Sequence, residues 1–219
     1  TKPRKNCENG DDKMERIVIL NGSPRAPKSN SKCYADIFSK KYNKDIEYYN
    51  ITKQNHDKLC SKMNDFSDML LVFPLYADGI PATLLNFLKS LENNLPDKKP
   101  VISVIINCGF LEYTQNDLAV KMIELFCKKT NCEFGSVLKI GSGEAILKTP
   151  FKIFVTRKVK KLANSILSKN YKTLHITMPL TPKLFIKAST KYWIEYGNRN
   201  GITKEQMDTM SIEDDNTLV

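Results

Sequence analysis

The sequence predicts an α/β protein with one parallel sheet that is covered by helices on both faces. Short apolar segments typical of buried strands alternate with segments whose apolar residues recur at helical spacing. The first strand, residues 17–20, is apolar at every position, as expected when both of its faces are covered. A polar loop joins that strand directly to a helix, so the chain starts a right-handed strand–helix–strand unit.

Five segments have the length and the composition of parallel strands. We predict them at residues 17–20, 46–51, 69–73, 101–106 and 137–140. Five strands of this kind favour the order 2-1-3-4-5, and ligands then bind outside the carboxyl ends of the strands, between the first and the third. The loops that lie at this edge start at Gly22, Pro74, Asn107 and Gly141.

Helices are expected between the strands and after the last one. The helix after the third strand starts with Pro81, where the missing N–H of proline costs no hydrogen bond. The last covering helix is predicted at residues 154–167. The residues expected to face inward are, in chain order, Cys33, Tyr34, Ile37, Phe38, Tyr42, Leu84, Leu85, Leu88, Leu91, Leu118, Met122, Ile123, Phe126, Val155, Val159, Leu162 and Ile166.

The loop after the first strand has the composition of a phosphate site. Its hydroxyl groups come from Ser23, Ser29 and Ser31, and Asn30 adds an amide. A loop that enters a helix points free backbone N–H groups and the positive end of the helix dipole at one spot, which suits a phosphate dianion. An ordinary loop with Ser31 or Asn30 as the helix N-cap is the alternative that composition leaves open.

Other motifs for phosphate, nucleophile or metal chemistry are missing from the sequence. There is no G-x-x-x-x-G-K-[ST], no G-x-G-x-x-G after the first strand and no G-x-S-x-G. His56 and Cys60 have ligand-like spacing without a second pair, so no metal site is predicted. The six cysteines form no C-x-x-C pair, which favours free thiols over disulfides or an iron–sulfur cluster.

The chain of 219 residues carries a net charge of +10. Its densest cationic cluster lies at residues 157–161, on the solvent side of the last predicted helix, and no nucleic-acid motif accompanies it. Nucleic-acid binding is therefore not expected. No apolar segment approaches the roughly 18 residues of a membrane span, and no signal peptide is recognisable, so we expect a cytoplasmic protein without membrane insertion.

Three segments differ in composition. Residues 1–15 are polar and without period, as in a flexible tail. Residues 16–169 hold the predicted sheet and helices, and residues 170–219 form a helical extension. The aromatic residues of this extension, Tyr192, Trp193 and Tyr196, are expected to pack either on the folded domain or on a partner subunit.

Four segments follow one another in an order that matches a known family. They are residues 22–31, 73–92, 103–110 and 140–144. Together they resemble the FMN-phosphate loop, the isoalloxazine loop with its following helix, and the two remaining carboxyl-end loops of the flavodoxin-like NAD(P)H-dependent FMN reductases and oxidoreductases. The resemblance extends over residues 16–167 and implies a three-layer flavodoxin-like fold.

The resemblance also implies an FMN site. The first loop would hold the phosphate, and the second and third would border the ring. The residues that it assigns to cofactor binding are Ser23, Arg25, Ser29, Asn30, Ser31, Pro74, Leu75, Tyr76, Ala77, Asp78, Gly79, Asn107, Cys108, Gly109, Phe110, Gly141, Gly143 and Glu144. Because the flavin carries the chemistry in this family, no catalytic side chain is assigned.

The implied activity is that of an FMN-dependent oxidoreductase. It would accept hydride from NADPH or NADH and reduce a flavin, quinone, nitro compound or similar small acceptor, and a homodimer is expected. The positive net charge supports this assignment, because it attracts a polyanion such as NADPH, whereas flavodoxins typically work through an acidic surface. The alternatives are a non-enzymatic FMN electron carrier and a flavin-free binding descendant.

Overall fold

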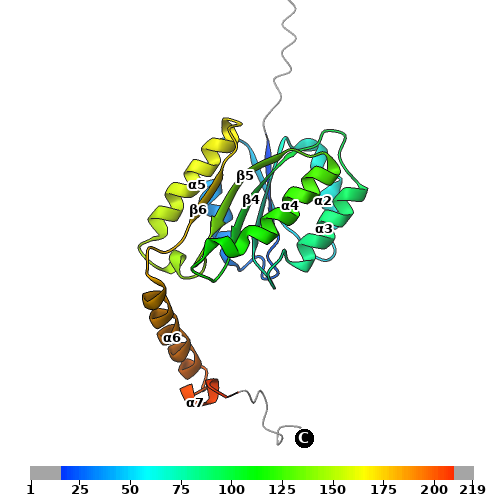
Figure 1. Cartoon of the computed structure of the whole chain (residues 1–219). Helices are drawn as coiled ribbons and strands as arrows, with labels where there is room; N and C mark the ends of the chain where they lie inside the picture. The colour runs from blue at the N-terminus through cyan, green and yellow to red at the C-terminus, as the bar shows by residue number, and fades with distance from the viewer. Residues whose placement is uncertain (1–15, 210–219) are drawn as a thin grey trace, which may run out of the picture. The chain divides into compact units, whose positions relative to one another are not determined.

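The computed structural model of the chain describes residues 16–209. It divides into two compact units, the first ending at Met178 and the second beginning at Pro179. The first unit is a three-layer α/β structure with a central sheet between two layers of helices (Figure 1). This architecture confirms the predicted fold class.

All strands of the sheet are parallel, in the order β2-β1-β3-β4-β5-β6. Their bounds are Ile17–Asn21 (β1), Ile46–Asn50 (β2), Asp68–Pro74 (β3), Val101–Asn107 (β4), Phe134–Ile140 (β5) and Thr173–Ile176 (β6). The predicted order of the first five strands is correct, but the predicted number of strands is wrong, because β6 adds a sixth beside β5.

The sixth strand escaped the sequence prediction for a physical reason. Thr173–Ile176 has only four residues, and its side chains are alternately exposed and half-buried. An edge strand pairs on one side only and needs no continuous apolar run, unlike a strand buried in the middle of a parallel sheet. The segment was therefore assigned to the extension that follows the domain.

Helices cover both faces of the sheet. In the first unit they are Asn30–Ser39 (α1), His56–Cys60 (α2), Ala82–Asn93 (α3), Asp117–Thr130 (α4) and Lys152–Leu167 (α5). The helices α1 and α5 lie on one face, and α3 and α4 lie on the other (Figure 1). Side chains of β1 alternate between the two layers, with Val18 and Leu20 in the same core cluster as Phe87 of α3.

The inward faces of the helices agree with the prediction at most positions. Two residues contradict it: Cys33 is exposed, and Leu118 is 61% exposed. The helix α4 instead turns Ala119, Ile123 and Cys127 inward. Ala119 thus faces the sheet on this helix, whereas spacing alone favoured the larger leucine one position earlier.

The second unit consists of α6 (Pro182–Arg199) and α7 (Lys204–Met207). The chain reverses after α6 at Gly201, whose φ of 76° lies in the left-handed region. A capping box between Thr203 and Gln206 starts α7. Gly197 is buried at this reversal, because a Cβ there would lie 2.6 Å from the Sδ of Met207. The two helices therefore form one hairpin.

Aromatic side chains of α6 pack on one another. The ring centroids of Tyr192 and Trp193 lie 5.3 Å apart, and those of Trp193 and Tyr196 lie 5.9 Å apart. All three rings are exposed. That these rings pack on the folded domain or on a partner subunit stays a prediction.

Within residues 16–209, no helix has both the length and the apolar character that crossing a bilayer requires.

Candidate functional site

The carboxyl ends of β1, β3 and β4 border a cavity of about 580 Å³, and the loop after β5 closes it. This volume lies within the range of about 300–1,000 Å³ that small-molecule sites occupy. The residues lining the cavity are Ser23, Pro24, Arg25, Lys28, Ser29, Asn30, Ser31, Cys33, Pro74, Tyr76, Asn107, Glu144 and Lys148. All four loops predicted at this edge of the sheet contribute to it.

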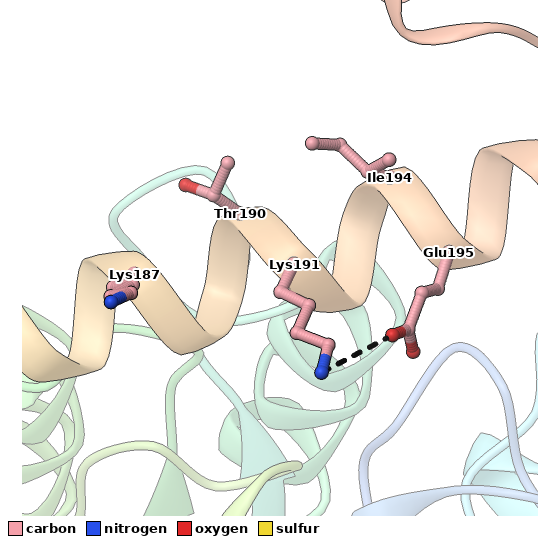
Figure 2. Close-up of a pocket in the computed structure, with 5 residues that line it drawn as sticks. All are labelled: Lys187, Thr190, Lys191, Ile194 and Glu195. Carbon is pink, nitrogen blue, oxygen red and sulfur yellow. Dashed lines mark ion pairs between the residues drawn. The ribbon is translucent and has the colours of Figure 1, made fainter.

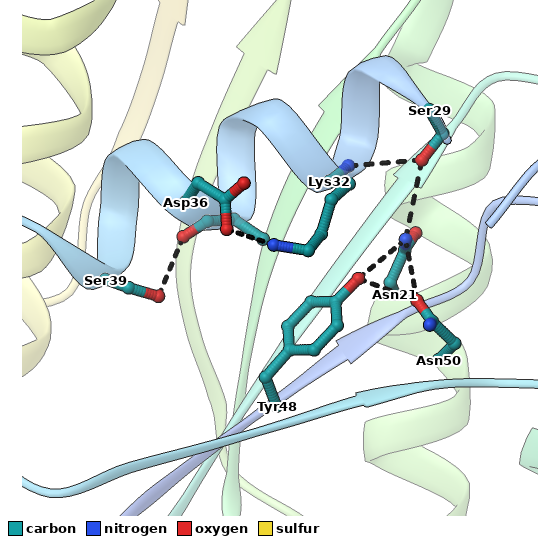
Figure 3. A network of polar contacts seen from close by, with 8 residues as sticks. Asn21, Ser29, Lys32, Asp36, Ser39, Tyr48 and Asn50 are labelled. Carbon is teal, nitrogen blue, oxygen red and sulfur yellow. Dashed lines mark hydrogen bonds and ion pairs between the residues drawn. The ribbon is translucent and has the colours of Figure 1, made fainter. Parts of the chain in front are cut away.

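The first loop is held by Asn21, the last residue of β1. The buried Asn21 side chain accepts a hydrogen bond from the Ser23 N–H at 3.0 Å through Oδ1. Its Nδ2 lies 2.9 Å from the Tyr48 hydroxyl, 3.2 Å from Asn50 Oδ1 and 3.4 Å from Ser29 Oγ (Figure 3). Asn21 therefore contacts both ends of the loop and ties it to β2.

Sequence reasoning missed Asn21 as a residue of the site. The position of Asn21 could have identified it, because a polar residue directly after a fully apolar strand is buried and needs hydrogen-bond partners. Which partners it finds depends on β2 and on the loop, and both are brought to it only by folding.

The N-terminus of α1 points unsatisfied donors at the cavity. Ser29 is the N-cap, and its Oγ accepts from the Lys32 N–H at 3.1 Å. The alternative of an ordinary loop had Asn30 or Ser31 in this position. Within the described part of the chain, the N–H groups of Asn30 and Ser31 have no acceptor. Two free N–H groups at a helix N-terminus form an anion site.

The charges around the cavity favour an anion. Arg25 and Lys28 are exposed, and neither forms an ion pair with any residue between 16 and 209. Lys148 pairs with Glu144, with 2.6 Å between Nζ and Oε1. The rim thus carries three cations against one carboxylate, and Lys28 and Lys148 were not among the predicted site residues.

A tight turn borders the cavity on the β3 side. Tyr76 and Gly79 exchange two backbone hydrogen bonds of 3.0 and 3.1 Å, and the residues between them, Ala77 and Asp78, have φ values of 47° and 56°. This is the geometry of a two-residue type I′ turn, which non-glycine residues adopt only at a cost in energy. The turn leaves the Tyr76 ring 61% exposed beside the cavity, where it offers a flat stacking face.

Half of the predicted site residues do not line the cavity. Gly141 and Gly143 are buried, and the space that each leaves open is filled by the chain: a Cβ on Gly141 would lie 2.5 Å from the Leu111 carbonyl oxygen. Tyr34 of α1 donates to the Gly143 carbonyl and so ties this loop to the helix of the anion site. The other predicted residues outside the lining are Leu75, Ala77, Asp78, Gly79, Cys108, Gly109 and Phe110.

A second hollow, of about 480 Å³, lies along α6 (Figure 2). It is lined by Lys187, Thr190, Lys191, Ile194 and Glu195, with 3.8 Å between Lys191 Nζ and Glu195 Oε1. All five residues belong to one exposed helix face, and an exposed ion pair of this kind contributes little. The cavity at the sheet edge, where groups from separate loops converge, is the candidate site.

Known proteins share this architecture. No family model and no curated protein matches the chain. Among solved structures, an FMN-dependent NADH-azoreductase from Bacillus anthracis in complex with FMN is 14% identical, with a TM-score of 0.55, 70% of this chain covered and 99% of that chain covered. The NAD(P)H:quinone oxidoreductase from Methanothermobacter marburgensis is 9% identical, with a TM-score of 0.56 and coverages of 70% and 96%.

A flavodoxin from Streptococcus pneumoniae is also similar, at 16% identity and a TM-score of 0.50, with 70% of this chain and 98% of that chain covered. At identities this low, such likenesses establish the fold. The chain is an α/β protein with the flavodoxin-like fold, and its candidate site lies at the carboxyl edge of the sheet, where this fold class binds ligands.

Proposed function

We propose that the protein is an FMN-dependent oxidoreductase that takes hydride from NADPH or NADH and passes electrons to a small acceptor such as a flavin, a quinone or a nitro compound. The observation that carries the proposal is the anion site at the N-terminus of α1, inside a cavity of about 580 Å³. The similarity to an azoreductase that binds FMN and to a quinone oxidoreductase supports it.

The residues around the cavity fit the parts of FMN. The free N–H groups of Asn30 and Ser31 and the hydroxyl of Ser23 are donors for the phosphate, and Tyr76 offers a face for the ring. Donors outnumber acceptors at the anion site, as a dianion requires.

Bound FMN would supply the hydride and electron transfer chemistry. The protein's part is to anchor the phosphate, to flank the ring with the Tyr76 turn and to attract the anionic nucleotide through Arg25 and Lys28. No side chain is assigned a proton-transfer role, because the flavin carries the chemistry in proteins of this kind.

A non-enzymatic electron carrier is the second candidate, and the similarity to a flavodoxin favours it. Arg25 and Lys28 lie beside the cavity and form no ion pair with any residue between 16 and 209. They argue for the reductase, because they attract a phosphate-rich dinucleotide. We further propose a cytoplasmic homodimer. The five described cysteines are free, as in a reducing compartment, and the exposed aromatic rings of α6 are typical of interface residues.

Visible absorption spectroscopy tests the proposal. Protein mixed with FMN and desalted is expected to retain the flavin bands, and anaerobic NADPH is expected to bleach them. Retained bands that NADPH leaves unchanged would favour the electron carrier. Absence of retained flavin would contradict both candidates and favour a flavin-free binding protein.

Thiol labelling provides an independent test of where FMN binds. Cys33 is exposed and lines the cavity, whereas burial raises the pKa of Cys60 to about 11 and that of Cys127 to about 12. In a Cys7→Ser variant, iodoacetamide is expected to modify Cys33 first, and FMN is expected to slow this reaction severalfold. Peptide mass spectrometry measures the rate, and an unchanged rate with saturating FMN would place the flavin elsewhere.

A further inference from the structure

The hydroxyl of Ser29 is surrounded by donors. Its Oγ accepts from the Lys32 N–H at 3.1 Å and faces Asn21 Nδ2 at 3.4 Å (Figure 3). A hydroxyl has two acceptor lone pairs and a single hydrogen. The Asn21 amide has only two hydrogens and also reaches the Tyr48 hydroxyl and Asn50 Oδ1, so it shares its donation among three acceptors. The Ser29 hydroxyl itself donates to no acceptor within residues 16–209, so its hydrogen is available to a ligand.

The hydroxyl of Ser31 accepts from a single donor, which belongs to another strand. Asn107, the last residue of β4, donates from Nδ2 to Ser31 Oγ at 3.2 Å. Both side chains are buried, at 4% and 0% exposure, and both line the cavity. In the part of the chain that the structure describes, the Ser31 hydroxyl donates to no acceptor.

Backbone groups determine which way each asparagine amide points. Asn21 Oδ1 accepts from the Ser23 N–H at 3.0 Å, and only an oxygen can accept there. Asn107 Nδ2 donates to the Phe73 carbonyl at 3.2 Å, and only an NH₂ group can donate there. Each amide therefore presents its NH₂ group to a serine oxygen, and the reversed orientation would lose a backbone hydrogen bond.

We propose that Asn21 and Asn107 are positioning residues that hold the hydroxyls of Ser29 and Ser31 as donors toward the phosphate of FMN. A phosphate dianion offers acceptors only, so a hydroxyl committed to donating binds it without first breaking a hydrogen bond. Both asparagines sit at the ends of buried strands, which keeps them rigid. This inference rests on the proposed function, because it assumes that the anion is the flavin phosphate.

A double-mutant cycle measured with two flavins tests the inference. The variants are Asn107→Leu, Ser31→Ala and the double variant, and the affinities for FMN and riboflavin are measured by fluorescence titration. Each single variant is expected to weaken FMN binding about 10-fold, the usual cost of a lost hydrogen bond to a charged group. Riboflavin lacks the phosphate, so its affinity is expected to stay within about twofold, well below that cost.

The double variant separates positioning from an independent contact. If Asn107 acts through Ser31, the double variant binds FMN about as weakly as Ser31→Ala alone. Losses that multiply in the double variant, or equal losses for FMN and riboflavin, would overturn the inference. The Asn107→Asp variant keeps the shape of the side chain but presents an oxygen to Ser31, and it is expected to bind FMN more weakly than Asn107→Leu does. If the variants of Asn107 and Ser31 fail to fold, the same cycle is measured with Asn21→Leu and Ser29→Ala.

A control and the wild-type protein complete the design. Ser136→Ala removes a buried hydroxyl that bonds to Ser165 outside the cavity, and it is expected to leave both affinities unchanged. If the wild-type protein binds FMN and the Asn107→Leu and Asn21→Leu variants bind it equally well, the positioning role is wrong and the proposed function stands. If inorganic phosphate raises the thermal stability of the wild-type protein but not that of the variants, and the wild type binds no flavin, the proposed function alone is wrong. If the wild type binds neither phosphate nor flavin, both the positioning role and the proposed function are wrong.

Discussion

Replacement of Gly141 with alanine is expected to destabilise the protein by about 3 kcal/mol, at the upper end of the usual cost of overpacking. The added Cβ would lie 2.5 Å from the Leu111 carbonyl oxygen and 2.8 Å from Thr177 Oγ1. The first of these atoms belongs to the backbone, so the clash cannot be relieved by a side-chain rotation. Urea unfolding with a two-state fit measures the change in free energy of unfolding.

Gly109 is the matched control, because it lies in the neighbouring loop and a Cβ there would meet nothing within 4 Å. Gly109→Ala is expected to change the free energy of unfolding by less than about 0.5 kcal/mol, as exposed substitutions usually do. Equal destabilisation by the two variants would show that the loop after β5 does not pack as the structure has it. The same comparison bears on the site, because Gly141 was predicted to be a cofactor-binding residue, whereas it does not line the cavity and packs against the Leu111 carbonyl.

The Ser23→Ala, Asn30→Ala double variant is expected to weaken FMN binding roughly 100-fold while leaving the fold intact, because it removes the Ser23 hydroxyl and the Asn30 side-chain amide, two of the side-chain donors that the sequence predicts for the phosphate. Both residues line the cavity, and Ser23 also accepts from the Arg25 N–H at 3.3 Å. Flavin fluorescence titration measures the affinity, and thermal unfolding without ligand checks stability.

Ser39→Ala is the control for this double variant. Ser39 is the last residue of the same helix, its hydroxyl donates to the Ala35 carbonyl at 2.9 Å, and it does not line the cavity. Its FMN affinity is expected to equal that of the wild type. An unchanged affinity in the double variant would contradict the assignment of the Ser23 hydroxyl and the Asn30 amide as phosphate donors.

The first loop shows which residues of the candidate site can be predicted from the sequence and which cannot. Its serines, Asn30 and Arg25, which were predicted to bind a phosphate, all line the cavity. They come together because a strand–helix junction is built from one continuous segment. The cations Lys28 and Lys148 and the thiol of Cys33 were missed. Lysine and cysteine are common on solvated surfaces, so their type and spacing do not distinguish a cavity wall from an ordinary exposed face.

The helix α4 illustrates the same limit in the core. Ile123 is inward under either of two helix orientations, one with Leu118 and one with Ala119, and hydrophobicity favours the leucine. The structure takes the second orientation, so that Ala119 and Cys127 face the sheet and Leu118 stays 61% exposed. Which side of a helix packs depends on the shape of the surface opposite, and this information is absent from the helix's own sequence.

The amino-acid sequence alone was enough to predict the parallel α/β sheet, the order of its first five strands and the loop that lines the cavity at the end of β1. These features follow from apolar runs, helical periodicity and loop chemistry, each of which lies within a short segment. Three features became visible only in the folded chain: Thr173–Ile176 joins the sheet edge, Gly141 packs against Leu111, and the amides of Asn21 and Asn107 lie within hydrogen-bond distance of Ser29 and Ser31. Each of these depends on a partner distant along the chain, and only folding brings the two together.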